Sequence, residues 1–124
     1  MESAMVFDKL GQVIFWHLPP DRSQGAIPDS KDLWSILWET RECLGGVAHT
    51  HPWDGESWMS HTDVTTFAAI EAGLGKRLIW PIVTFTEVGY FEWVGPDRLD
   101  YTTTNRRRFR LDPNDIEHLR DISR

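Results

Sequence analysis

The chain has little of what would place it outside the cell or in a membrane. Its single cysteine, Cys43, excludes a disulfide within the chain and is typical of a reducing compartment. No apolar run approaches the roughly 18 residues that a membrane span needs, and no positively charged leader precedes an apolar segment. We therefore expect a cytoplasmic protein with no membrane partner.

The sequence also lacks an excess of basic residues, internal repeats and low-complexity segments. Its formal net charge of −6 argues against nucleic acid as the main partner. The apolar fraction of 40% and the charged fraction of 26% are ordinary for a globular protein. With 124 residues the chain can build one core, so we predict a single domain over residues 1–124.

Hydrophobic patterning in the first half of the chain predicts two strands and then a helix. The β-rich runs within residues 5–17 indicate a hairpin. Asp29 or Ser30 is expected to cap a helix that runs to about Cys43, and Gly45-Gly46 is expected to end it.

The second half predicts a helix between strands. A nearly continuous apolar run over residues 78–86 indicates a buried central strand, with a bulge or an edge position at Pro81 because proline lacks a ladder donor. The other expected elements are a helix at about residues 64–72, a strand at 89–94, and a short C-terminal helix at 113–122. Residues 99–103 and 106–111 are expected to form a further hairpin, or one strand followed by an exposed basic segment. This order predicts an α/β fold with a mixed central β-sheet flanked by helices.

The most informative stretch is the short strand that carries His49 and His51. Side chains alternate along a strand, so both imidazoles project from one face and can share a metal ion. Asp63, at the start of the following helix, can supply an oxygen ligand to the same ion. Two imidazoles and one carboxylate leave the fourth tetrahedral position open, which is typical of a catalytic zinc site.

The full pattern is H-x-H-P at residues 49–52 followed by S-x-x-D at residues 60–63. It resembles the JAMM motif of the MPN+ zinc metalloproteases, over roughly residues 27–94 of the chain. The loop between His51 and Ser60 is one residue longer than the usual family spacing. The resemblance implies an MPN/JAMM-like, cytidine-deaminase-like fold, and the small size of the chain suggests a compact prokaryotic or phage-type member.

Site residues carry over from this resemblance. It implies Zn²⁺ as the cofactor, with His49, His51 and Asp63 as ligands, and Ser60 as a hydrogen-bond donor to the oxyanion of a tetrahedral intermediate. The family also needs an upstream glutamate as general acid/base, and Glu2 is the only one at a comparable distance.

Three alternatives for this acid/base remain open: Glu56 in the loop, Asp8, or no residue at all. Trp53 and Trp58, in the same loop as Glu56, are candidates for the wall of a substrate groove or for packing on the sheet edge.

The expected function is therefore zinc-dependent hydrolysis of a peptide or isopeptide bond, in a tail of a ubiquitin-like or other small protein. Two alternatives remain open. One is a zinc-binding, noncatalytic MPN module that acts in protein assembly. The other is a metal amidase or peptidoglycan peptidase, because the chemistry of a fold depends on its pocket walls. The sequence makes no prediction of the oligomeric state.

Overall fold

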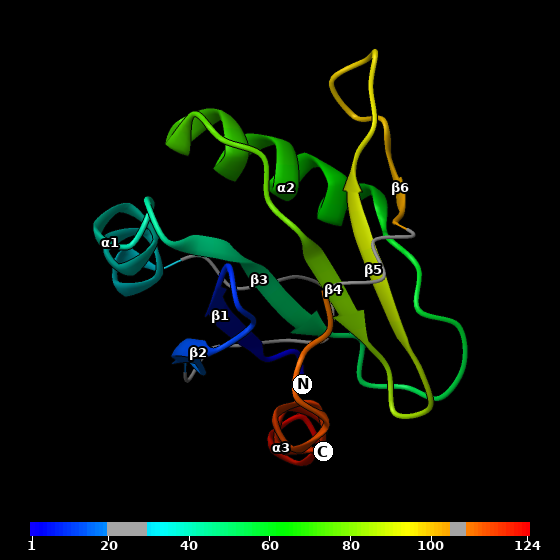
Figure 1. Cartoon of the computed structure of the whole chain (residues 1–124). Coiled ribbons are helices and arrows are strands. Elements are labelled where there is room, and N and C mark those ends of the chain that lie inside the picture. The colour runs from blue at the N-terminus through cyan, green and yellow to red at the C-terminus, as the bar shows by residue number, and fades with distance from the viewer. Residues whose placement is uncertain (20–29, 105–108) are drawn as a thin grey trace.

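The computed structural model describes residues 1–19, 30–104 and 109–124, and shows a mixed α/β fold (Figure 1). Asp29 and residues 106–108, for which the sequence predicts a cap and a strand, lie outside the described residues. In chain order the elements of the described part are β1 (Ala4–Asp8), β2 (Val13–His17), α1 (Lys31–Glu39), β3 (Leu44–Thr50), α2 (His61–Leu74), β4 (Trp80–Val83), β5 (Val88–Trp93), β6 (Tyr101–Thr103) and α3 (Pro113–Ile122).

The strands form one sheet in the order β2-β1-β3-β4-β5-β6. Only the β3–β4 pair is parallel among the named neighbours, and α2 makes the crossover between them. The predicted mixed central sheet, flanked by helices and followed by a short C-terminal helix, is confirmed.

Helices cover both faces of the sheet, as Figure 1 shows. On one face, Leu37 of α1 and Phe67 of α2 pack against Val47 of β3 and Trp80 of β4. On the other face, Leu119 of α3 packs in a separate cluster with the strand residues that alternate with those of the first cluster. Because alternate residues of a strand face opposite ways, β3 contributes to both cores and joins the two layers.

The prediction that α1 reaches Cys43 and ends at Gly45-Gly46 is wrong. α1 ends at Glu39, and both glycines belong to β3. They are required there by close backbone contacts. A Cβ on Gly46 would lie 1.8 Å from the Ile79 carbonyl oxygen, and one on Gly45 would lie 2.3 Å from that of Asp8. The pair therefore marks a crowded strand and not a helix end.

The prediction of a bulge or an edge at Pro81 is also wrong. β4 is an interior strand, and its pairing with β5 is regular from Trp80 to Val83. The Ile79 N–H donates to β3, and the Val83 carbonyl accepts from His51. The backbone N–H groups of a strand point alternately toward its two neighbours, so the nitrogen of Pro81 points toward β3, as that of Ile79 does. Proline in this interior position therefore removes a single hydrogen bond of the ladder.

The other two helices begin and end with clear capping residues. Ser60 caps α2, which ends at Gly75 in the left-handed conformation (φ 69°). Asp112 caps α3, and Pro113 occupies its first turn, so the predicted bounds of this helix are confirmed. Among the described residues, the structure contains no helix that combines the length and the apolar character of a membrane span.

The close approach of β3 to its neighbours gives a stability test. Gly46→Ala is expected to lower the free energy of unfolding by about 3 kcal/mol or more, because the Ile79 backbone cannot move away from the new methyl group. Gly73→Ala, within α2, meets only ordinary contact with Trp34 at 3.4 Å and is expected to be neutral or to stabilise by up to about 1 kcal/mol. Urea denaturation of both variants checks this, and equal stabilities would contradict it.

Candidate metal centre

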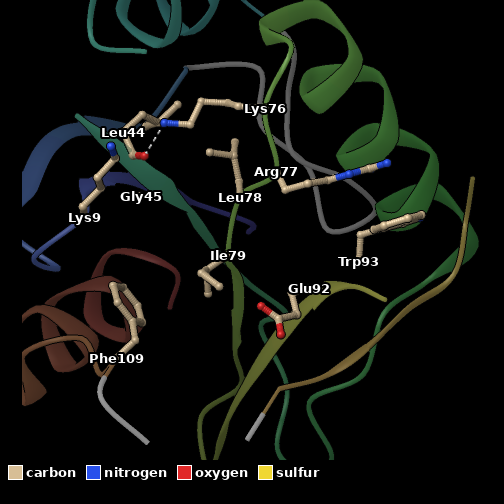
Figure 2. A pocket seen from close by; sticks show the side chains of 10 residues that line it. All are labelled: Lys9, Leu44, Gly45, Lys76, Arg77, Leu78, Ile79, Glu92, Trp93 and Phe109. Atoms are coloured by element: carbon tan, nitrogen blue, oxygen red, sulfur yellow. Dashed lines mark hydrogen bonds between the residues drawn. The ribbon is translucent and has the colours of Figure 1, made fainter. Parts of the chain in front are cut away.

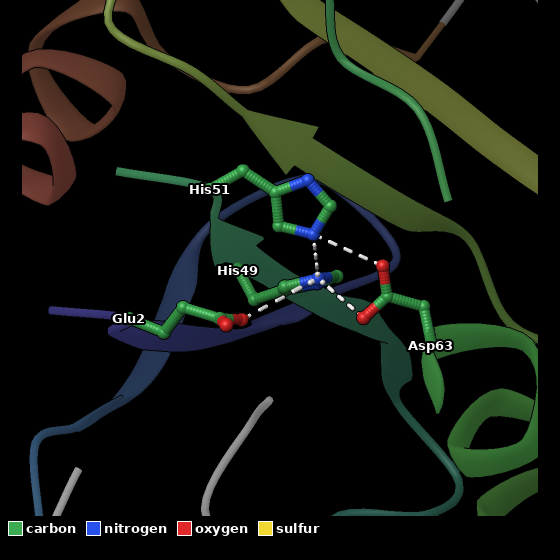
Figure 3. A group of neighbouring side chains, drawn as sticks. All are labelled: Glu2, His49, His51 and Asp63. Atoms are coloured by element: carbon green, nitrogen blue, oxygen red, sulfur yellow. Dashed lines mark hydrogen bonds and ion pairs between the residues drawn. The ribbon is translucent and has the colours of Figure 1, made fainter. Parts of the chain in front are cut away.

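His49 and His51 point to the same side of the sheet, as strand alternation requires (Figure 3). His49 lies within β3 and pairs with Ala4 of β1 and Ile82 of β4. His51 follows the strand, and its N–H donates to the Val83 carbonyl. The two Nε2 atoms lie 3.2 Å apart, and both side chains are buried. The prediction that both imidazoles project from one face of the strand is confirmed.

Asp63 reaches the histidines from the first turn of α2. Its Oδ1 lies 3.0 Å from His49 Nε2, and its Oδ2 lies 3.0 Å from His51 Nε2. A capping box holds it in place: the Asp63 N–H donates to Ser60 Oγ, and the Ser60 N–H donates to Asp63 Oδ2. The S-x-x-D spacing therefore both starts the helix and orients the carboxylate.

Glu2 completes the cluster from the segment before β1. Its side chain is only 2% exposed, and its Oε1 lies 4.0 Å from His49 Nε2. The alternatives are less suited. Glu56 is exposed on its loop, and Asp8 accepts the backbone N–H groups of Leu10 and Gln12 in the β1–β2 turn. Of the three candidates for the acid/base, Glu2 is thus the one that the fold brings to the histidines.

The separations of the donor atoms suit a small tetrahedral ion. Zinc bonds of about 2.0–2.1 Å imply edges of about 3.3 Å between ligand atoms. The Nε2 atoms of His49 and His51 lie 3.2 Å apart, and each lies 3.0 Å from a different oxygen of the Asp63 carboxylate. One ligand atom from each of the four residues, Glu2 included, lies within 4.8 Å of the others. The cluster could therefore hold a metal ion, and its nitrogen and oxygen donors fit zinc among other divalent cations.

Several polar atoms of this cluster have no hydrogen-bond partner among the described residues. They are Glu2 Oε1 and the Nδ1 atoms of both histidines. Metal-binding histidines generally donate their second N–H to a neighbour, and the described part of the chain supplies no such neighbour to either ring. The orientation of the imidazoles comes instead from the strand and from the ring of Trp53, which stacks on His51 at 4.6 Å.

The pKa values of the two carboxyl groups move in opposite directions. Burial, and then the nearby Asp63 carboxylate, raise the pKa of Glu2 to about 8, against the opposing charge of the chain's amino terminus. Burial also acts to raise the pKa of Asp63. Hydrogen bonds with His49 and His51, the His49 charge and the Ser60 N–H outweigh it, and hold this pKa well below its usual range. The cluster thus contains one ionised carboxylate and one carboxyl group that holds its proton near neutral pH.

The other predicted site residues lie around this cluster. Ser60 is exposed at the start of α2, where its oxygen accepts the Asp63 N–H. Trp53 is 45% exposed and lies against His51. Trp58 is 50% exposed and packs edge-on against Phe91 of β5. Of the two tryptophans, Trp53 is therefore the one that contacts a metal-ligand candidate.

A third buried acidic side chain, Glu71 of α2, was not predicted as a site from the sequence. It accepts hydrogen bonds from the Leu78 N–H, the Trp80 indole and the Arg77 guanidinium, and a short one from the Tyr101 hydroxyl. The signal was available, because Glu71 falls on the apolar stripe of its helix. With all these donors in place, the carboxylate joins α2 to the sheet and has a structural role.

A cleft of about 390 Å³ lies at the amino ends of β3 and β4, away from the histidines (Figure 2). Lys76 and Arg77 line it, but each already has partners. Lys76 Nζ donates to the carbonyls of Arg41 and Leu44, and Arg77 pairs with Glu71 and lies over the Trp93 ring at 3.9 Å. These cations hold the surrounding loops together, so the metal centre remains the stronger candidate site.

The raised pKa of Glu2 predicts a pH dependence of stability in the metal-free protein. The folded state holds a proton on Glu2 that the unfolded chain releases, so this contribution is present below pH 4.5 and is lost as the pH rises through about 8. The free energy of unfolding of the wild type should therefore fall over this range relative to that of Glu2→Gln. Urea titrations with a chelator present measure the difference, and a difference independent of pH would contradict the expectation.

Comparison with known proteins adds no assignment. Neither the protein-family models nor the curated protein sequences give a match to this chain.

Proposed function

We propose that this protein is a zinc-dependent hydrolase of peptide or isopeptide bonds, with His49, His51 and Asp63 as the metal ligands. The observation that carries the proposal is the convergence of their donor atoms, 3.0 to 3.2 Å apart, inside the protein. A zinc ion held there would polarise a substrate carbonyl and lower the pKa of a coordinated water to about 7. The ligand set and the upstream glutamate also support membership of the MPN+ family.

Glu2 is the proposed general acid/base. Its Oε1 is buried and has no hydrogen-bond partner among the described residues, so it can accept a proton from an attacking water. Glu2 Oε1 lies 4.0 Å from His49 Nε2, which is longer than the distance between two ligand atoms of a tetrahedral zinc site. This separation favours a role for Glu2 beside the metal ion over direct coordination of the ion. A bound divalent cation would favour the ionised form of Glu2, which is the form that accepts a proton, and the carboxyl group could then deliver this proton to a leaving amine.

Ser60 and Trp53 flank the reacting groups. The Ser60 oxygen accepts the Asp63 N–H, so its own hydrogen is available for the developing oxyanion of a substrate. Trp53 presents an exposed indole beside His51 and would form one wall of the substrate site. Trp58, which packs on Phe91, would lie farther along the same loop surface. An extended peptide, such as the tail of a ubiquitin-like or other small protein, is the proposed substrate.

The second candidate is a zinc-binding module without catalysis. Its support is the burial of all four side chains, together with ligand atoms that lie within 4.8 Å of one another. If Glu2 moved by a small distance, it would become the fourth ligand and close the shell, as in structural zinc sites. The two candidates therefore differ in the role of Glu2.

Metal content tests the ligand assignment. The purified wild type is expected to bind one zinc ion, and His49→Ala is expected to lose it, because two of three ligands do not hold zinc tightly. His61→Ala is the matched control, since His61 is exposed one residue after Ser60 and lies outside the cluster. Elemental analysis after dialysis measures the stoichiometry. Zinc retained in His49→Ala would refute the assignment.

The variant Glu2→Gln separates the two candidates. If Glu2 is the acid/base, zinc affinity is unchanged and cleavage of a fluorogenic peptide and isopeptide panel falls by a factor of about 10²–10⁴. If Glu2 is the fourth ligand, zinc affinity falls instead, and the wild type cleaves no member of the panel. Titration with a competing chelator, run beside the cleavage assay, gives both measurements on the same samples.

A further inference from the structure

The segment that carries Glu2 is anchored on both sides of this residue. On one side, the Met1 nitrogen donates to the Ser123 carbonyl at 2.9 Å. On the other, the Ser3 N–H donates to Thr50 Oγ1 at 2.9 Å, and the Thr50 N–H donates to the Ser3 carbonyl at 3.0 Å. Figure 1 shows the corresponding arrangement, with the N-terminus beside the end of α3.

Both anchors lead to Ser123, the C-cap of α3. Thr50 Oγ1 lies 2.8 Å from Ser123 Oγ, which in turn donates to the Leu119 carbonyl at 2.8 Å. Each hydroxyl has one hydrogen, and Ser123 uses its own for Leu119. Thr50 is therefore the donor to Ser123, and the chain of hydrogen bonds runs from the Ser3 N–H through two hydroxyls into the helix.

This hydrogen-bond chain lies on the opposite face of the sheet from the metal centre. His49 and His51 face α2, so Thr50, between them, faces α3. Thr50 and Ser123 are 1% and 2% exposed, and neither belongs to the metal-ligand cluster. An effect of Ser123 on Glu2 must therefore pass through the backbone of residues 1–3.

We propose that Ser123 is a positioning residue that holds the backbone of Glu2 in place from the far side of the sheet. The proposal rests on the proposed function for the role of Glu2 as acid/base. The first residues of a chain are generally poorly ordered unless they are tied down, and here α3 provides the tie. Proton transfer needs the carboxyl group at hydrogen-bond distance from its partner, so a small shift of this segment affects the rate more than it affects metal binding.

Amide hydrogen exchange, measured by NMR on the metal-free protein, tests the anchoring without any assay of activity. In Ser123→Ala, the Thr50 hydroxyl loses Ser123 Oγ as its acceptor and is left with the more distant Ser3 carbonyl at 3.4 Å. We expect exchange of the Ser3 amide to become about tenfold faster or more. Thr50→Val, which removes the acceptor of the Ser3 N–H itself, is expected to accelerate this exchange by more than Ser123→Ala does.

The matched control is Asp112→Ala, which removes the N-cap at the opposite end of α3. It weakens the same helix without touching the hydrogen-bond chain, so the Ser3 amide should exchange as slowly as in the wild type after correction for global stability. Equal acceleration in Ser123→Ala and Asp112→Ala would overturn the proposal, because the effect would then be loss of helix stability alone.

Kinetics test the consequence for the reaction. Ser123→Ala should lower kcat about tenfold, with KM and zinc content unchanged. In the Glu2→Gln background it should cause no further loss, because its effect passes through that side chain. An equal loss in both backgrounds would contradict a positioning role. Faster Ser3 exchange in a protein whose wild type cleaves no substrate would refute the proposed function and leave the anchoring by Ser123 established.

Discussion

The buried carboxylate of Asp63 is the group on which the candidate site depends. It lies 3.0 Å from each of two imidazole Nε2 atoms that are themselves only 3.2 Å apart. Without it, His49 and His51 would face each other inside the protein with no opposite charge between them, at a cost of several kcal/mol for any buried proton they shared. A divalent cation at this point would satisfy all three groups at once, and would also favour ionisation of a neighbouring carboxyl group.

Such an arrangement demands accuracy of about 0.5 Å from elements that come from different parts of the chain. β3 provides it by alternation, which places both imidazoles on one face. α2 provides it by its capping box, in which Ser60 and Asp63 bond to each other's backbone. The crowded glycines at the start of β3 serve the same end, because they let the central strand pack closely against its neighbours.

Much of this could be predicted from the sequence because the determinants are local. The H-x-H spacing on an apolar run defines a face, and S-x-x-D before a helix defines both a cap and the direction of a carboxylate. The two failures in the fold arose where one local signal has two meanings. A Gly-Gly pair such as Gly45-Gly46 is common at the end of a helix, but a strand also needs glycine where neighbouring backbones nearly touch. Pro81 is unfavourable in a sheet, yet the β4 ladder absorbs one missing donor.

The position of Glu2 could not be predicted in the same way, because nothing near it in the sequence holds it. Its neighbours Met1 and Ser3 are held by hydrogen bonds to Ser123 and Thr50, which lie far along the chain. The proposed metal ligands are thus encoded in one short stretch, whereas the position of the proposed acid/base depends on the tertiary structure. Under the proposed function, a chain could retain the complete H-x-H and S-x-x-D pattern and bind a metal, yet lose proton transfer through a change in its last helix. For this architecture, the motif predicts metal binding, and the contacts of the N-terminal segment with α3 would decide whether catalysis accompanies it.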